Sequence, residues 1–384
     1  MSGMTLAKLE PYLWIDKPEE LQTLATRLKR EHILAIDTES NSLYAYRERV
    51  CLVQISTTER DYLIDSLAIQ DMEPLRPIFA DDQIEKVFHA AEYDLICLRR
   101  DFGFEFSNLF DTMLAARIAG WQRFGLGDIL QAEFGILLDK RFQRADWGQR
   151  PLPKALKDYA RLDSHYLIRL RHRLRQELEE KGRWELALED FRRLCKSGEV
   201  NSEPTEADIC RVNGGGELPP RKYTVLKALC QYRDRLARQM DRPLFKVIGD
   251  KTLLAIAEAC PTNLEELESA PGMSRGQIKR YGEGLLSAVQ AGLNAPLAHL
   301  ERSPRPDSAF LKRLDVLRAW RKETARQMGV ESDVVLPRDL LHALAETGPT
   351  EKEALANLLR DVPWRLNQFG DELLKLMRES HKQL

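Results

Sequence analysis

An acidic pair near the N-terminus has the type and spacing of catalytic carboxylates. Asp37 and Glu39 stand one residue apart at the end of the apolar run 32–37, and alternate residues of a β-strand face the same way. The two carboxylates are therefore expected to project together from the end of a strand. The same spacing recurs at Asp71 and Glu73, so the context of the first pair, and not its spacing, distinguishes it.

Three further residues could join this pair. Asp94 lies where the β-rich run 86–90 gives way to a helical segment. Tyr159 and Asp163 stand four residues apart in a later helical segment, a spacing that places both side chains on one helix face. Each fragment alone is also typical of a solvated surface acid or a helix cap. The order of the fragments and their places on strand ends and helices single out the set.

Four carboxylates that meet in one place repel one another unless cations neutralise them. Two divalent ions would balance the charge, and such a pair suits in-line displacement at phosphorus: one ion generates hydroxide and the other stabilises the leaving oxygen. Oxygen ligands alone favour Mg²⁺ or Mn²⁺ over zinc. The acidic set therefore predicts two-metal chemistry on a phosphodiester.

The first half of the chain contains the elements that must position these residues. Its β-rich runs are residues 32–37, 50–57, 61–66 and 86–90, and its helical stretches include 19–30 and 72–80. Strands that alternate with helices of this length predict an α/β domain. From Tyr159 onward the apolar residues recur every three to four positions, which is typical of helices.

The rest of the chain is expected to be helical and divided by linkers. Residues 197–220 are polar and rich in Gly and Pro, which indicates a linker whose triple glycine 214–216 is a flexible connector. The segments 232–267 and 320–355 repeat one order of features, which indicates two copies of a small helical module. The predicted parts are a first domain 1–196, a linker 197–220, a helical domain 221–293, a linker 294–308 and a second, degenerate helical domain 309–384.

Several motifs resemble one known family. The stretches DTESNSLYAYRERVCLVQIST, HAAEYDLICL, FDTMLAARIAG and DYARLDSHYL resemble the tyrosine subclass of the DEDD exonuclease superfamily, and within it the bacterial ribonuclease D family. The helical blocks resemble two copies of the HRDC (helicase-and-RNase-D C-terminal) domain, the first copy more clearly. The resemblance implies a ribonuclease H-like domain, a mixed sheet flanked by helices, followed by two small all-α domains.

The same resemblance implies roles for individual residues. Asp37, Glu39, Asp94 and Asp163 would be the ligands of two divalent metal ions, Mg²⁺ or Mn²⁺. Tyr159 would orient the attacking water, since a phenol with a pKa near ~10 is a poor base at neutral pH. The implied activity is that of a 3′→5′ exoribonuclease that releases 5′-mononucleotides, with precursor transfer RNAs and other small structured RNAs as substrates.

One alternative concerns the tyrosine. His89 and Asp94 form the pattern His-x₄-Asp, which in the histidine subclass of the same superfamily is the third motif. The pattern falls where the second motif belongs and leaves no suitable acidic residue before it. We therefore expect His89 to end the strand and to pack or hydrogen-bond nearby.

A basic region precedes and includes the helix of Tyr159. Residues 140–184 hold 13 Lys and Arg against 6 Asp and Glu, a net charge of +7, and cations with an interleaved aromatic residue are typical of single-strand binding. A solvated helix surface would show much of the same pattern. The candidate RNA contacts are Lys140, Arg141, Arg144, Trp147 and Arg150, with Lys279 and Tyr281 in the first HRDC-like block.

Composition limits the remaining possibilities. The 384 residues carry 58 basic and 60 acidic side chains, a net charge of −2, so a polyanion would bind to local patches. The chain has no apolar run that approaches ~18 residues, no secretion signal and no CxxC among its six cysteines, which favours the cytoplasm and argues against membrane association. No obligate protein partner is evident. The competing functions are a DNA 3′→5′ exonuclease and a catalytically silent RNA-binding scaffold.

Overall fold

The computed structural model describes residues 9–196, 209–299 and 307–382, which fall into two compact units. The first unit draws its described residues from Met1–Glu39, Val50–Val200 and Arg305–Leu384, and the second from Ser40–Arg49 and Asn201–Pro304. The short segment Ser40–Arg49, which sequence analysis placed in the first domain, thus belongs to the second unit. No helix in the described ranges is long and apolar enough to cross a membrane.

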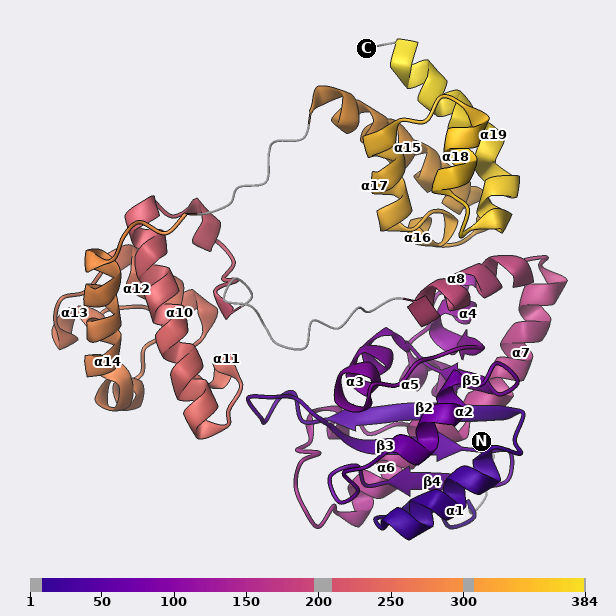
Figure 1. Cartoon of the computed structure of the whole chain (residues 1–384), viewed down its shortest axis with the longest axis horizontal. Helices are drawn as coiled ribbons and strands as arrows, with labels where there is room; N and C mark the ends of the chain where they lie inside the picture. The colour runs from indigo at the N-terminus through magenta and orange to yellow at the C-terminus, as the bar shows by residue number, and fades with distance from the viewer. Residues whose placement is uncertain (1–8, 197–208, 300–306, 383–384) are drawn as a thin grey trace, which may run out of the picture. The chain divides into compact units, whose positions relative to one another are not determined.

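A six-stranded mixed sheet forms the centre of the first unit (Figure 1). Its order is β1-β4-β3-β2-β5-β6; β2 runs parallel to β5, β5 to β6 and β1 to β4, whereas β3 and β4 are antiparallel. The strands are β1 Leu13–Ile15, β2 Ile33–Ser40, β3 Val50–Ser56, β4 Asp61–Ile64, β5 Glu85–Phe88 and β6 Leu109–Asp111. The mixed sheet expected from the family resemblance is confirmed, and the four β-rich runs of the sequence are its four central and longer strands.

Helices cover both faces of this sheet. The alternation of side chains along β2 decides which face each one packs on: Leu34 and Ile36 lie in the cluster that includes α1 and α3, whereas Ala35 lies in the cluster of α4, α7 and α8. The helices are α1 Pro18–Leu28, α2 Arg76–Ala80, α3 Glu92–Phe102, α4 Thr112–Ala119, α5 Leu126–Phe134, α6 Lys154–His165, α7 Leu167–Glu180 and α8 Trp184–Lys196, with 3₁₀ turns η1 Glu73–Leu75 and η2 Phe142–Arg144.

The second unit is helical, as expected, but its boundary differs from the prediction. Cys210, Val212 and Leu218 are buried in its core, so residues 209–218 are part of the unit and not of a linker. This Gly-rich stretch contains interspersed apolar residues, and their burial against the helices is favourable. The elements are η3 Gly215–Glu217, α10 Pro220–Met240, α11 Leu244–Val247, α12 Asp250–Ala259, α13 Leu264–Glu268 and α14 Arg275–Asn294. Positions 197–208 of the predicted linker lie outside the described residues.

The C-terminal helices repeat the same order of lengths. α10 to α14 have 21, 4, 10, 5 and 20 residues, and α15 to α19 have 21, 4, 10, 7 and 20. The second set has a core of its own, which includes Leu317, Leu344 and Leu373. Its helices are α15 Ser308–Met328, α16 Ser332–Val335, α17 Arg338–Thr347, α18 Lys352–Leu358 and α19 Pro363–Lys382. The repeated helical module predicted from the sequence is therefore present.

Candidate functional site

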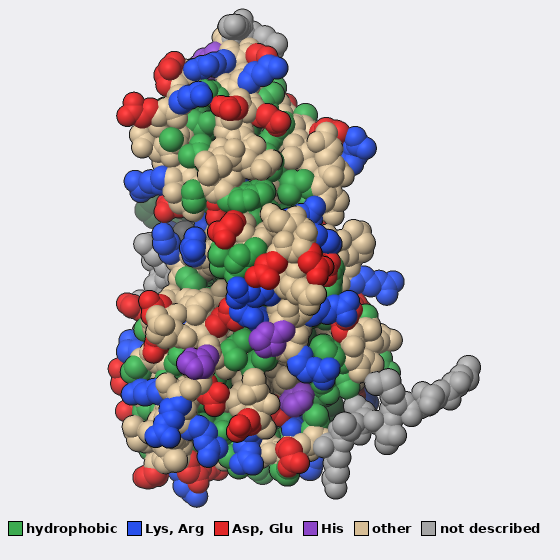
Figure 2. Space-filling model, turned by 90° about the vertical axis from the view of Figure 1, so that its right-hand side faces the viewer, with side chains coloured by type: hydrophobic (Ala, Val, Ile, Leu, Met, Phe, Trp, Pro, Cys, Tyr) green, Lys and Arg blue, Asp and Glu red, His purple; other side chains and the backbone are tan. Residues whose placement is uncertain are grey.

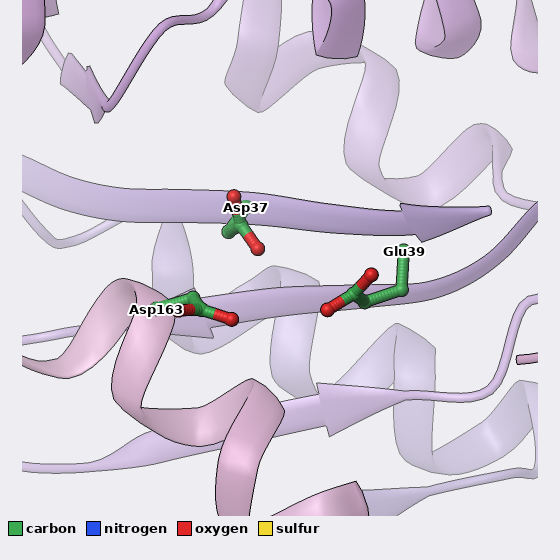
Figure 3. A group of neighbouring side chains, drawn as sticks. All are labelled: Asp37, Glu39 and Asp163. Atoms are coloured by element: carbon green, nitrogen blue, oxygen red, sulfur yellow. The ribbon is translucent and has the colours of Figure 1, made fainter. Parts of the chain in front are cut away.

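Three carboxylates from two elements meet at one end of β2. Asp37 and Glu39 project from β2 and Asp163 from α6, and their side chains point into a common space (Figure 3). One carboxylate oxygen of each lies within 4.8 Å of the others. The strand alternation explains the meeting, because Asp37 and Glu39 follow Ala35 on the same face and α6 packs against the neighbouring strands β3 and β4 on that face.

Asp94, the fourth predicted ligand, comes from a helix on the other face of the sheet and is not one of the three carboxylates whose oxygens meet. Asp94 is buried in the first turn of α3 and accepts a hydrogen bond from Thr38 Oγ1. Thr38 lies between Asp37 and Glu39 in the strand, so its side chain points to the face that α3 covers. The backbone N–H of Ala91, just before α3, donates to Asp111 Oδ2 at 2.7 Å, which ties the start of this helix to β6.

The electrostatics of the four carboxylates favour a bound cation. Lost hydration, and then the neighbouring carboxylates, raise the pKa values of Asp37 and Glu39 well above their ordinary range. Burial is also the main cause that raises the pKa of Asp94 to about 7 and that of Asp163 to about 8. Within the described ranges, no Lys or Arg side chain forms an ion pair with any of the four.

This donor set fits a divalent cation. Closely spaced carboxylates without a basic partner are costly to hold ionised unless an ion is bound between them. The ligand atoms are all carboxylate oxygens, which suit hard cations such as Mg²⁺ and Mn²⁺. Asp37, Glu39 and Asp163 supply the compact part of the site, and Asp94 lies close enough to raise the pKa of Asp37.

Tyr159 borders the carboxylates from α6. Its ring is buried, and Asp163 lies one turn further along the same face of the helix. Burial and the nearby carboxylates raise the pKa of Tyr159 above its ordinary value. The hydroxyl therefore stays protonated at neutral pH, and it can orient a neighbouring group by hydrogen bonding but cannot act as a base.

His89 hydrogen-bonds to a threonine and not to the four candidate metal ligands. Its Nδ1 lies 2.9 Å from Thr112 Oγ1, and Thr112 Oγ1 donates to the carbonyl of Phe88. The Thr112 oxygen therefore accepts a hydrogen bond from His89, which assigns the proton to Nδ1. Burial lowers the pKa of His89. This placement agrees with a histidine that ends the strand and hydrogen-bonds nearby.

The candidate RNA contacts of the first domain fall into two groups. Lys140, Arg141 and Arg144 are exposed in the segment that includes η2. Trp147 is buried against the Tyr159 ring, with the ring centroids 6.3 Å apart, so it offers no free face for stacking. Arg150 lies in a bidentate ion pair with Asp65, with Nη2 to Oδ1 at 2.6 Å. Sequence analysis could not anticipate either placement, since both depend on distant packing partners.

The two candidates in the second unit are also placed differently from each other. Lys279 is exposed on α14. Tyr281 is buried in the core of the unit, and its hydroxyl lies 3.7 Å from Met240 Sδ. The ring of Tyr281, a candidate RNA contact, therefore packs inside the unit. On the face that Figure 2 displays, Lys and Arg side chains are interspersed with Asp and Glu, in keeping with the nearly neutral chain.

Two residues near the carboxylates were missed by the sequence analysis. Thr38 binds Asp94, and Phe142 of η2 packs edge-on against the Tyr159 ring. Thr38 could have been noticed, because it stands between the two acids of the first pair. Phe142 has no local signal, since only the tertiary fold brings η2 to α6.

Comparison with known proteins assigns the two kinds of domain. Residues 12–179 match the family model of a 3′-5′ exonuclease, and residues 223–289 and 310–377 each match that of the HRDC domain. The first match contains Asp37, Glu39, Asp94, Tyr159 and Asp163. The two HRDC matches coincide with α10–α14 and α15–α19.

Comparisons with whole proteins agree with these domain matches. The chain is 31% identical to ribonuclease D of Granulibacter bethesdensis, over 98% of this chain and 95% of that relative. It is also 31% identical to the protein RRP6-like 1 of Arabidopsis thaliana, but spans only 51% of that longer relative. The crystal structure of RNase D from Escherichia coli, called an exoribonuclease involved in structured RNA processing, has a TM-score of 0.69 and 26% identity, over 92% of this chain and all of that one.

Proposed function

Because the chain belongs to the ribonuclease D family, we propose that it is a 3′→5′ exoribonuclease that hydrolyses RNA from its 3′ end and releases 5′-mononucleotides. One observation carries the proposal: among the described residues, three carboxylates that form no ion pair with Lys or Arg have oxygens within 4.8 Å of one another, in the domain that matches the 3′-5′ exonuclease model. A silent RNA-binding scaffold would have no reason to retain so costly a group of charges.

Asp37, Glu39, Asp94 and Asp163 would together hold two divalent ions, Mg²⁺ or Mn²⁺. When bound, such ions supply positive charge to the phosphate oxygens and lower the pKa of water. The four carboxylates would hold this charge, since the fold places them before RNA arrives. Thr38 fixes the rotamer of Asp94 by its hydrogen bond.

Tyr159 would orient the attacking water. Burial and the nearby carboxylates raise the pKa of the phenol, so it is neutral, and it lies one helical turn from Asp163. A hydroxyl in this position restrains a water molecule in the direction of attack without removing its proton. The exposed Lys140, Arg141 and Arg144 would bind the RNA backbone next to this group.

The proposed substrates are precursor transfer RNAs and other small structured RNAs. The Escherichia coli relative is described as acting in structured RNA processing. Two HRDC domains accompany the exonuclease domain here, and tethered modules raise the local concentration of a bound RNA without any single strong site. A long unstructured RNA would not use this arrangement to the same extent.

The assignment of the positioning residue is tested by two substitutions. Tyr159→Phe should lower kcat at least about tenfold, because it removes the hydroxyl beside the attacking water. His89→Ala should cost less, because that ring is bonded to Thr112. Steady-state assays on a short single-stranded RNA measure both. The reverse ranking would transfer the role to His89.

The activity itself is tested with a 3′-extended transfer RNA whose products are resolved by length. Wild-type protein with Mg²⁺ or Mn²⁺ should shorten the RNA one nucleotide at a time and release 5′-mononucleotides, and Asp37→Ala should not. A DNA strand of the same sequence is the comparison substrate. Faster loss of the DNA would favour a DNA exonuclease, and RNA binding without any shortening would favour the scaffold.

A further inference from the structure

The two HRDC domains are in register along their helices. Each helix of α15–α19 begins 88 positions after its counterpart in α10–α14, so the residues of the two domains correspond one to one. An equivalent hydrogen bond shows that the match extends to tertiary contacts. Gln277 Nε2 donates to the carbonyl of Val247 at 3.1 Å, and Arg365 Nε donates to the carbonyl of Val335 at the same distance. The same face can therefore be compared in both domains.

In the second HRDC domain, the face around this hydrogen bond is bound to the exonuclease domain of the same unit. The Arg365 side chain is fully buried, and its Nη1 lies 3.0 Å from Glu189 Oε2 of α8. Val334 of α16 lies in the apolar cluster of α4, α7 and α8. Acidic side chains of the same face form ion pairs with arginines of α4 and α8, namely Asp333 with Arg117 and Asp339 with Arg193. Helix α16 and the first turns of α17 and α19 thus form one docking face.

The counterpart face of the first HRDC domain has the opposite charge. Residues 241–251 and 274–280 hold six Lys and Arg against two Asp, a net charge of +4. Their counterparts, residues 329–339 and 362–368, hold two Arg against three acidic residues, a net charge of −1. The arginines of α4 and α8 that attract the second domain would repel a face like that of the first. A face with this charge suits a polyanion.

The side chains that carry this positive charge are accessible. All six cations are exposed, namely Arg242, Lys246, Lys251, Arg275, Lys279 and Arg280. Phe245 lies in the same segment with 57% of its surface exposed, and an aromatic ring among cations can stack on a base beside the phosphate contacts. Of the two acids, Asp250 is already paired with the buried Arg233. The ion pair of Arg275 with Glu268 is exposed and long, at 3.7 Å, so it competes weakly with a phosphate.

We propose that the first HRDC domain binds the substrate RNA through this face, with its cations on backbone phosphates and the Phe245 ring on an unpaired base. The second HRDC domain does not bind RNA with its counterpart face, because the exonuclease domain already occupies that face. The inference rests on the proposed exonuclease function and divides the work between the two domains. One domain binds RNA, and the other is part of the catalytic unit.

The test measures equilibrium binding of a 3′-extended transfer RNA to the full chain in the Asp37→Asn background, which removes hydrolysis from the readout. Lys251→Glu combined with Arg275→Glu should raise Kd at least about tenfold. The slope of log Kd against log salt concentration should fall by about 2, since two phosphate contacts are lost. Phe245→Ala should raise Kd about fivefold or more without a change of that slope. All three side chains are exposed, so thermal unfolding should be nearly unchanged.

The matched control combines Arg211→Glu with Arg338→Glu, which changes the net charge by the same amount. Arg211 is exposed outside the two segments of the basic face, and Arg338 is exposed in the second HRDC domain. This control should leave Kd within about twofold.

Two results would overturn the inference. An equal loss of affinity in the control would assign the effect to net charge alone. An unchanged Kd for Lys251→Glu with Arg275→Glu would leave the face for a protein partner. Wild-type protein that binds this RNA but never shortens it would instead overturn the proposed function, so the two failures are distinct.

Discussion

Replacement of Asp37 by Asn is expected to lower the rate of RNA hydrolysis by about a thousandfold or more, a loss of the size seen when charge stabilisation at a reacting phosphate is removed. Asp37 belongs to the three carboxylates whose oxygens lie within 4.8 Å of one another. An amide has the same shape but no charge, so it binds a divalent ion much more weakly. Single-turnover assays at saturating Mg²⁺ and Mn²⁺ measure the change.

The metal-free fold should tolerate this change. Asp37 has no basic partner among the described residues, and burial, followed by repulsion from the neighbouring carboxylates, raises its pKa. Removal of that charge should leave the Tm of the metal-free protein equal or higher. Asp71→Asn is a matched control, because it alters an exposed Asp in the second Asp-x-Glu pattern. Retention of activity within about tenfold by Asp37→Asn would contradict a ligand role.

The contribution of the four carboxylates to the stability of the metal-free protein is expected to fall as the pH rises from about 4 to about 8. The folded-state pKa values of Asp94 and Asp163, about 7 and about 8, lie above the ordinary value of 3.8. Between these limits the folded state binds more protons than the unfolded state, so deprotonation favours unfolding. The contribution is favourable at low pH and is lost as the pH passes through the raised values.

Metal ions should reverse this trend. Binding requires ionised carboxylates, so Mn²⁺ should raise the Tm by more at about pH 8.5 than at about pH 5.5, and should release protons. Thermal unfolding in chelator and in excess Mn²⁺ at the two pH values measures the difference, with Asp37→Asn as the control that reduces it. An equal Tm increase at both pH values would show that the ion binds elsewhere.

The sequence alone determined the parts of the site that depend on local periodicity. The pairing of Asp37 with Glu39 follows from strand alternation, and that of Tyr159 with Asp163 follows from the helical repeat. Both patterns need only neighbouring residues, and the structure has each pair on the expected element. The short strands β1 and β6 escaped prediction because three residues are too few to show alternation.

Other features depended on which distant residues meet. Asp94 joined the set through motif order and family resemblance, but its bond to Thr38 is a product of the fold. Phe142 lies against the Tyr159 ring because η2 packs against α6. The distance between these partners along the sequence does not predict their contact, because the contact arises only when their elements pack together.

The clearest differences are the aromatic and basic residues expected to contact RNA. A sequence shows that Trp147 and Arg150 are suited to nucleic acid, but it does not show whether another part of the chain already uses them. The tertiary structure buries Trp147 against Tyr159 and pairs Arg150 with Asp65, 85 positions away. The residue types of the segment can be seen in the sequence itself. The solvent exposure of each side chain was decided by long-range packing, because burial depends on every element that comes near.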